Sequence, residues 1–92
     1  MIEIEYHDRF LRAIKQLPPA IAAGAEAALG KVKTGYGDPH IHAGLKITKL
    51  RNNLFECRIG LRYRIILMAF PGSLVAYDIM THDELKKFLR AF

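Results

Sequence analysis

The stretch 54–70 alternates apolar and polar residues with a period of two on both sides of Gly60, which predicts two β-strands joined by a short turn. One face collects apolar residues of the same parity: Phe55, Cys57, Ile59, Tyr63, Ile65 and Leu67. The apolar residues of the first strand and those of the second reach one core only if the loop between the strands holds an odd number of residues. Residues 60–62 form such a loop and place Arg58 opposite Arg64. We expect the other face to be exposed, and it presents the charged side chains of Glu56, Arg58 and Arg64. Arg62 lies at the rim of this face, in the loop.

The N-terminal half of the chain predicts a short strand and two helices. Residues 2–6 alternate as a half-exposed strand, and an i, i+3, i+4, i+7 apolar stripe within residues 10–17 predicts a helix that Asp8 caps. Two prolines end this helix and open a second one over residues 19–33. Residues 34–44 contain glycines and a proline without periodicity, so we expect a loop there.

The C-terminal half predicts further strands and a last helix. Residues 46–50 predict a short strand, and the run Leu74–Met80, apolar on both faces apart from one aspartate, predicts a central strand. Thr81 and Glu84 have the spacing of a capping box, and the helix that they open carries an apolar stripe: Leu85, Phe88, Leu89 and Phe92. The order of elements predicts a single α+β domain over residues 1–92, with the N-terminal strand and helical hairpin packed on an antiparallel β-sheet and a short C-terminal helix.

Composition and charge narrow the classes of function. A chain of 92 residues with 51% hydrophobic content is sufficient for one core. The net charge is +5, and six of the fourteen basic residues lie between Lys46 and Arg64, where Glu56 is the only acid. Positive charge concentrated in this way indicates a polyanionic partner, either nucleic acid or an acidic protein.

Cysteine usage and hydropathy indicate the compartment. Cys57 is the lone cysteine, and its parity places it in the core, so we expect a buried structural thiol in a reducing cytoplasm. No apolar run is long enough to cross a membrane, and the sequence shows no signal peptide. We therefore expect a cytoplasmic protein with no membrane partner.

The order of elements, the basic hairpin LFECRIGLRYRIIL and the ending IMTHDELKKFL together resemble the RelE/ParE superfamily of bacterial type II toxins over nearly the whole chain. The strand pair has the form leucine, aromatic, polar, x, basic, followed by YRIIL, at residues 54–58 and 63–67. The ending THDEL is similar to the YafQ branch, whose members carry a threonine–histidine signature after the final strand.

The resemblance implies a toxin that cleaves mRNA on the ribosome as a metal-independent endoribonuclease, without a cofactor. It also implies a hetero-oligomer with a cognate antitoxin, whose extended segment wraps the domain and masks its basic face. The alternative from the same superfamily is a ParE-like inhibitor of DNA gyrase without nuclease activity. A toxin-like domain that has lost its activity is a third interpretation.

The hairpin arginines suit such chemistry. Metal-free RNA cleavage needs a base for the 2′-OH, cations beside the phosphate and an acid for the leaving 5′-oxygen. The guanidinium fork matches phosphate oxygens, so Arg58 and Arg64 are the first candidates and Arg62 is the third. The alternative is that they are solvated charges or pair with Glu56, although surface pairs contribute only about 0–1 kcal/mol. Glu56 is a candidate either for the base or for organising the arginines.

Histidine supplies the acid–base candidates, because imidazole changes its protonation state near neutral pH. His82 follows the last strand at the first position of the terminal helix, and the resemblance to the YafQ branch implies that it is catalytic. His42 loosely matches a loop histidine of that branch. The HIH spacing around it is a weak metal signal, and we expect no metal.

Three further basic residues complete the predicted site. Lys46, Lys49 and Arg51 precede the hairpin, and we expect them to hold the RNA backbone. One departure from the family is that no tyrosine follows Tyr77, so an aromatic platform for base stacking is missing from the C-terminal end.

Overall fold

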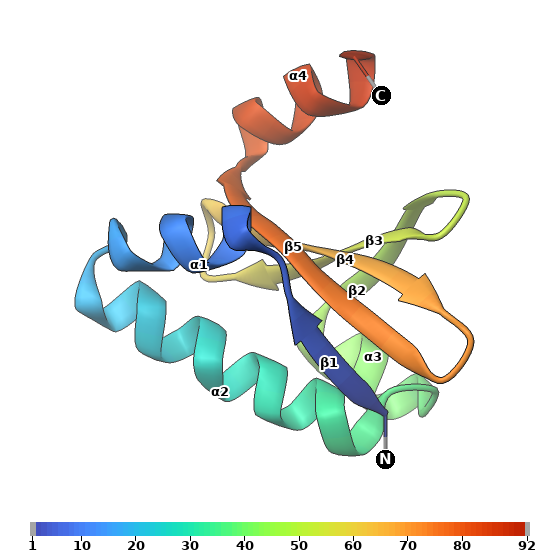
Figure 1. The fold of residues 1–92 in the computed structure, drawn as a ribbon. Coiled ribbons are helices and arrows are strands. Elements are labelled where there is room, and N and C mark those ends of the chain that lie inside the picture. The colour runs from blue at the N-terminus through green and yellow to red at the C-terminus, as the bar shows by residue number, and fades with distance from the viewer. Residues whose placement is uncertain (1, 92) are drawn as a thin grey trace.

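The computed structural model describes residues 2–91, in which one five-stranded sheet is accompanied by four helices (Figure 1). In chain order the elements are β1 (Glu3–Tyr6), α1 (Asp8–Lys15), α2 (Pro19–Gly35), α3 (Pro39–Leu45), β2 (Ile47–Arg51), β3 (Leu54–Ile59), β4 (Tyr63–Phe70), β5 (Ser73–Thr81) and α4 (His82–Ala91). The predicted α+β class is confirmed. Phe92, which we assigned to the stripe of the last helix, lies outside the described residues.

The strands lie in the order β1-β5-β4-β3-β2. The four later strands form the antiparallel meander that the short connections predict. The N-terminal strand differs, because β1 pairs in parallel with β5, which makes the sheet mixed. As its apolar pattern predicts, β5 lies inside the sheet, between β1 and β4.

The basic hairpin has the predicted register. Ile59 lies opposite Tyr63 and Arg58 opposite Arg64, so the connecting loop consists of residues 60–62. Gly60 has a φ of 63°, a left-handed conformation that costs glycine little, and this explains why a glycine begins the loop. The alternation of side chains between the two faces and the glycine at the start of the loop therefore determine the register of β3 with β4.

Each face of the sheet has its own hydrophobic core. The helical hairpin α1–α2 covers one face, on which apolar residues of both helices and of the central strands are buried: Phe10, Ala25, Leu29, Cys57, Ile65 and Leu67. The second, smaller core lies under α4 and joins Leu54, Ile66, Met80 and Leu85. Figure 1 shows α4 leaving the end of β5 on the side of the molecule away from α2. Beside the second core lie the buried charged residues Arg64 and Glu56, and Asp78 is a buried acid of β5 that pairs with the exposed Arg9.

The prediction of a loop over residues 34–44 was wrong. α2 continues to Gly35, and residues 39–45 form α3, whose N-cap Asp38 accepts a hydrogen bond from the His40 N–H at 2.8 Å. The Asp-Pro start signal was present, but seven residues are fewer than two helical turns, too few for a periodic stripe to appear. Gly35 permits the two helices to approach, because a Cβ there would lie 2.7 Å from Ile41 Cγ1.

The cap of α1 also differs from the prediction by one residue. His7, not Asp8, is the N-cap, and its Nδ1 accepts a hydrogen bond from the Arg9 N–H at 3.1 Å. Asp8 is instead the first helical residue, where its negative charge still complements the helix dipole.

Candidate functional site

The turn of the basic hairpin and the start of α4 meet at one corner of the sheet. The main-chain N–H of His82 donates a hydrogen bond to the Arg62 carbonyl oxygen at 3.1 Å. The register agrees, since Tyr63 lies opposite Thr81, the last residue of β5. The structure thus brings His82 beside Arg62, although twenty residues separate them in sequence.

The predicted capping box fixes where α4 begins, and with it the position of His82. The Thr81 N–H donates to Glu84 Oε1 at 2.7 Å, and the Glu84 N–H donates to Thr81 Oγ1 at 3.2 Å. These reciprocal bonds satisfy two main-chain donors at the strand–helix junction. His82 is therefore an exposed residue on a defined backbone.

Arg58 and Arg62 are the exposed cations of this corner. Arg58 lies one residue pair inside the turn, and the Arg62 guanidinium carbon lies 5.9 Å from the centroid of the Tyr63 ring. Within residues 2–91 neither arginine forms an ion pair. Both guanidinium groups are accordingly free to bind an external anion.

Arg64 is not on an exposed face, so that part of the prediction was wrong: the residue is 5% exposed. Its Nη1 donates to the carbonyl oxygens of Tyr63 at 3.2 Å and Leu61 at 3.4 Å. Its Nε lies 3.7 Å from Glu56 Oε1 and has no hydrogen-bond partner in the part of the chain that the structure describes. Arg64 is therefore a buried residue whose guanidinium binds the main chain of the hairpin turn.

Glu56 was also expected to be exposed, and it is 9% exposed. The physical reason is the terminal helix, because Leu85 packs with Leu54 and Ile66, the residues that share a face with Glu56 and Arg64. Alternation shows that a strand has two faces but does not show which of them is covered. The position of Glu56 agrees with the organising role that we considered for it.

His42 lies apart from this corner. Its Nε2 accepts a hydrogen bond from the Gly37 N–H at 2.9 Å, and its ring lies 4.9 Å from that of Tyr36. Tyr36 in turn contacts Phe55 edge-on, and Phe55 packs on the core beneath α1–α2. His42 therefore belongs to the opposite face of the sheet from Arg58, and the structure does not bring the two together.

The three predicted backbone-binding residues lie along the far edge of the sheet. β2 is an edge strand, and Lys49 and Arg51 are exposed on it. Lys46 is exposed as the left-handed C-cap of α3, with a φ of 54°. β2 pairs with β3, so these cations flank the hairpin that carries Arg58.

Cys57 is buried, as predicted. Burial, which is the larger cause, and the nearby Glu56 carboxylate together raise the pKa of its thiol to about 11. A thiol in this state is neutral at physiological pH and is not a nucleophile.

Within residues 2–91 there is no cluster of three or more histidine, cysteine, aspartate or glutamate side chains placed to hold a metal ion. Among the described helices, none is long and apolar enough to cross a membrane.

Sequence reasoning missed an ion pair between α1 and β5. Arg9 donates from Nε and Nη2 to Asp78 Oδ2 at 3.2 and 3.1 Å, and its guanidinium lies 5.2 Å from the Tyr77 ring centroid. The pair lines a cleft of about 580 Å³ between α1 and α4, into which Tyr63 also faces. The available signal was Asp78, the one charge in an otherwise apolar strand.

The corner combines an imidazole with unpaired guanidinium groups. An imidazole can donate or accept a proton near neutral pH, and guanidinium groups stabilise the negative charge that develops on a phosphate in a transfer reaction. The buried Arg64 and Glu56 add rigidity to the turn that carries Arg62.

Comparisons with known proteins agree on the fold. No protein-family model matches the sequence, and no curated protein matches it significantly. Among solved structures, a chain of the RelB-RelE antitoxin-toxin complex from Methanococcus jannaschii superposes with a TM-score of 0.74 at 14% identity, over 91% of this chain and 96% of that one. The isolated E. coli RelE toxin gives 0.67 at 14% identity, with 100% of both chains covered.

A structure named for the predicted branch is also similar. YafQ from E. coli strain BL21(DE3) superposes with a TM-score of 0.62 at 16% identity, over 92% of this chain and 98% of that one. Identities this low establish the architecture and leave the activity to be argued from the residues. The chain has the fold of the RelE-like toxins, as the sequence resemblance predicts.

Proposed function

We propose that this chain is the toxin of a type II toxin–antitoxin system and an endoribonuclease that cleaves mRNA on the ribosome. The RelE-like fold supports the toxin role. The observation that carries the nuclease role is the main-chain hydrogen bond from the His82 N–H to the Arg62 carbonyl, which places a histidine, able to transfer protons, next to the turn that carries an exposed arginine.

In the proposed reaction the ribose 2′-OH attacks the adjacent phosphorus. A base takes the 2′-OH proton, the new O2′–P bond forms as the P–O5′ bond breaks, and an acid protonates the departing 5′-oxygen. The products are a 2′,3′-cyclic phosphate and a 5′-hydroxyl. His82 supplies proton transfer, and Arg58 and Arg62 stabilise the charged phosphorane.

Arg64 and Glu56 serve this reaction as positioning residues. Their side chains are buried, and Arg64 holds the carbonyls of Leu61 and Tyr63, which flank Arg62. Lys46, Lys49 and Arg51 hold the RNA backbone along β2. His42 is left out of this mechanism, because it packs on the other face of the sheet.

The proposed partner is a cognate antitoxin in the cytoplasm. Three of the similar structures are complexes named for both RelE and RelB, from Methanococcus jannaschii, Pyrococcus horikoshii and E. coli. The exposed arginines and lysines of this chain would repel one another less when an acidic partner covers them. Binding to the ribosome and mRNA uses the same charges.

The test is induction of the wild type, His82→Ala and Arg58→Ala in a bacterial host, with the 5′ ends of transcripts mapped. We expect wild-type cleavage inside translated codons, and a loss of about 10²–10⁴-fold for His82→Ala, the usual contribution of general acid–base catalysis. His40→Ala and Arg12→Ala are matched controls, because both residues are exposed and lie outside the corner. Circular dichroism establishes that each variant is folded.

Other outcomes would contradict the proposal. Growth arrest with intact transcripts would favour inhibition of DNA gyrase or of another protein target. Cleavage that survives both corner substitutions would place the catalytic groups elsewhere. The absence of any arrest would favour a toxin-like domain without activity.

A further inference from the structure

The turn of the basic hairpin carries a large apolar side chain. Leu61 is 96% exposed, more than any other large apolar residue in the part of the chain that the structure describes. Its neighbours Arg58 and Arg62 are exposed and form no ion pair within residues 2–91. A single exposed leucine is common on protein surfaces, so exposure alone does not indicate a function. The case for a function comes from the main chain and the charges around Leu61.

The main chain of the turn is held at three successive carbonyl groups. The buried Arg64 donates from Nη1 to the carbonyl oxygens of Leu61 and Tyr63, at 3.4 and 3.2 Å. The His82 N–H donates to the carbonyl oxygen between them, that of Arg62, at 3.1 Å. The tip of the turn is therefore preorganised, and inserting Leu61 into a partner would require little further ordering of the main chain.

The surroundings of Leu61 favour RNA as this partner. Leu61 precedes Arg62, whose carbonyl holds His82, so the leucine lies beside the corner at which we place the scissile phosphate. An apolar protein pocket for Leu61 would desolvate the neighbouring guanidinium groups without pairing them, which is unfavourable. The bases of RNA present apolar faces close to phosphates, and this arrangement matches a leucine between arginines.

The proposed cleavage has a geometric requirement that a stacked strand does not meet. The attacking 2′-oxygen must lie in line with the P–O5′ bond, with the reacting atoms about 3–3.5 Å apart. In a helical strand the 2′-OH lies to the side of this line, so the two nucleotides must rotate apart and their bases must unstack. Leucine is one of the side chains that proteins insert between neighbouring bases to unstack them.

We propose that Leu61 is a wedge that inserts between the two bases flanking the scissile phosphate and holds this step of the RNA unstacked. Arg58 and Arg62 hold the phosphate while Leu61 occupies the space between the bases. The substrate is then RNA that is single-stranded at the cleaved step, because base pairing opposes the rotation. The wedge rests on the proposed ribonuclease activity, for which Leu61 is a positioning residue.

The first test measures single-turnover cleavage of mRNA on ribosomes halted before an unread codon. Leu61→Ala should lower the rate about ten- to hundredfold, because the variant lacks the group that opens the stack. The toxin concentration that gives half the maximal rate should change by less than about threefold, since the cations that bind the backbone are intact. Leu61→Met, which remains apolar, should retain most of the rate, whereas the polar Leu61→Gln should not.

An abasic mRNA separates unstacking from every other role of this residue. When the nucleotide on the 3′ side of the cleaved bond has no base, the step has no stack to open. The wild type and Leu61→Ala should then cleave at rates that agree within about twofold. A structural role of Leu61 would instead leave the variant equally impaired on both mRNAs.

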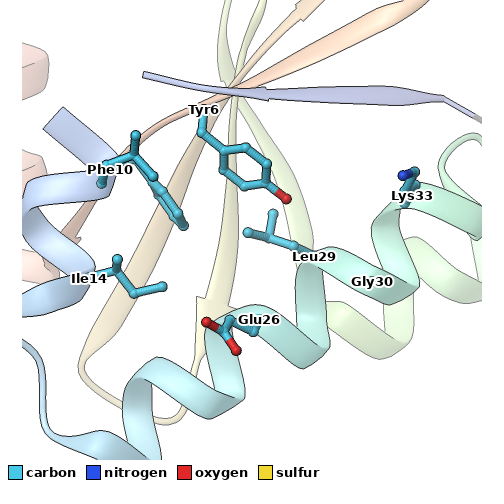
Figure 2. Close-up of a pocket in the computed structure, with 8 residues that line it drawn as sticks. Tyr6, Phe10, Ile14, Glu26, Leu29, Gly30 and Lys33 are labelled. Carbon is cyan, nitrogen blue, oxygen red and sulfur yellow. The ribbon is translucent and has the colours of Figure 1, made fainter. Parts of the chain in front are cut away.

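Leu11→Ala is the matched control, because it shortens another exposed leucine in the same way. Leu11 is 43% exposed and lines a mostly apolar groove between β1, α1 and α2 (Figure 2). Figure 2 shows the Tyr6 ring reaching from β1 toward Leu29 in this groove, which contains no residue of the basic corner. Leu11→Ala should cleave both mRNAs as the wild type does.

A second measurement does not depend on cleavage. The halted codon is made with 2′-deoxyribose, which removes the attacking hydroxyl, and carries 2-aminopurine at each of its positions in turn. The fluorescence of 2-aminopurine rises when its neighbours no longer stack on it. We expect saturating wild type to raise the fluorescence at the cleaved step, and saturating Leu61→Ala to leave it unchanged.

Three results would overturn the wedge: cleavage by Leu61→Ala at the wild-type rate, impaired cleavage of the abasic mRNA by this variant, or a fluorescence rise that does not require Leu61. The ribonuclease and the wedge can fail separately. A rise that requires Leu61, without cleavage of the ribose form, would contradict the ribonuclease and retain the wedge. Neither cleavage nor a rise with the wild type would overturn both.

Discussion

Replacing Arg64 with methionine tests whether the pair under α4 is buried in solution. The Nε–Oε1 distance of 3.7 Å corresponds to a Coulomb attraction of about 4–5 kcal/mol at an effective dielectric constant of about 20. The cost of desolvating both ions offsets much of this attraction. Removing one partner alone leaves the other charge buried, which usually costs about 3–5 kcal/mol. The contact with Glu56 lacks a hydrogen bond, so we expect the lower end, about 3 kcal/mol.

The assay is urea unfolding followed by circular dichroism, with the m-value checked for two-state behaviour. A chain of this length has a free energy of unfolding of about 5–14 kcal/mol, so a stable wild type leaves the variant folded. Glu56→Leu should cost a similar amount, whereas the double variant should lie within about 1 kcal/mol of the wild type. Arg58→Met is the matched control, since this exposed arginine faces Arg64 across the strands and should change stability by less than about 0.5 kcal/mol.

Additive effects below about 1 kcal/mol for the two single substitutions would refute this reasoning. They would show that the pair is solvated and that α4 does not cover it in solution. Arg64 would then return to the exposed face that the alternation of the strand predicts, and would join Arg58 as a candidate phosphate ligand.

Two other predictions concern stability. Gly30→Ala should raise the free energy of unfolding by up to about 1 kcal/mol, because alanine favours a helix and its Cβ meets open space. Gly35→Ala in the same helix should lower the free energy of unfolding by about 1–2 kcal/mol, because the new Cβ clashes with Ile41. Equal effects of the two substitutions in urea unfolding would contradict the close approach of α3 to α2. Burial and, to a smaller extent, Glu56 raise the pKa of the Cys57 thiol from 9.0 to about 11, so the folded protein keeps this proton at pH values where the unfolded chain has lost it. The free energy of unfolding should therefore fall as pH rises from about 9 to 11, by up to about 1.4 kcal/mol per pH unit. A Cys57→Ala variant with the same dependence of stability on pH would show that other groups cause the fall.

The sequence correctly predicted the features that depend only on neighbouring residues, such as strand alternation, loop length and helix capping. The period of two and the odd loop length gave the register of Arg58 with Arg64, and the threonine–glutamate spacing gave the capping box before α4. The central place of β5 followed from its apolar residues on both faces. These inferences needed no knowledge of which elements pack together.

The errors arose where distant segments meet. The stripe of α4 was predicted, but nothing in its pattern shows that Leu85 packs on Leu54 and so buries Glu56. Of the predicted site, Arg62 and His82 lie together because β4 pairs with β5 as far as Tyr63 and Thr81, and the register of that pairing was not predicted from the sequence. The separation of His42 from them likewise depends on where α3 packs, and α3 was not foreseen.

The parallel pairing of β1 with β5 sets the order in which the sheet can assemble. Glu3 pairs with Ser73, seventy residues further along the chain. At a synthesis rate of about 5–20 residues per second, β1 waits about 4–14 s on the ribosome before its partner strand exists. The β3–β4 hairpin, whose strands are adjacent in sequence, can form within microseconds of its appearance. The first strand to be synthesised is therefore among the last to take its place in the sheet.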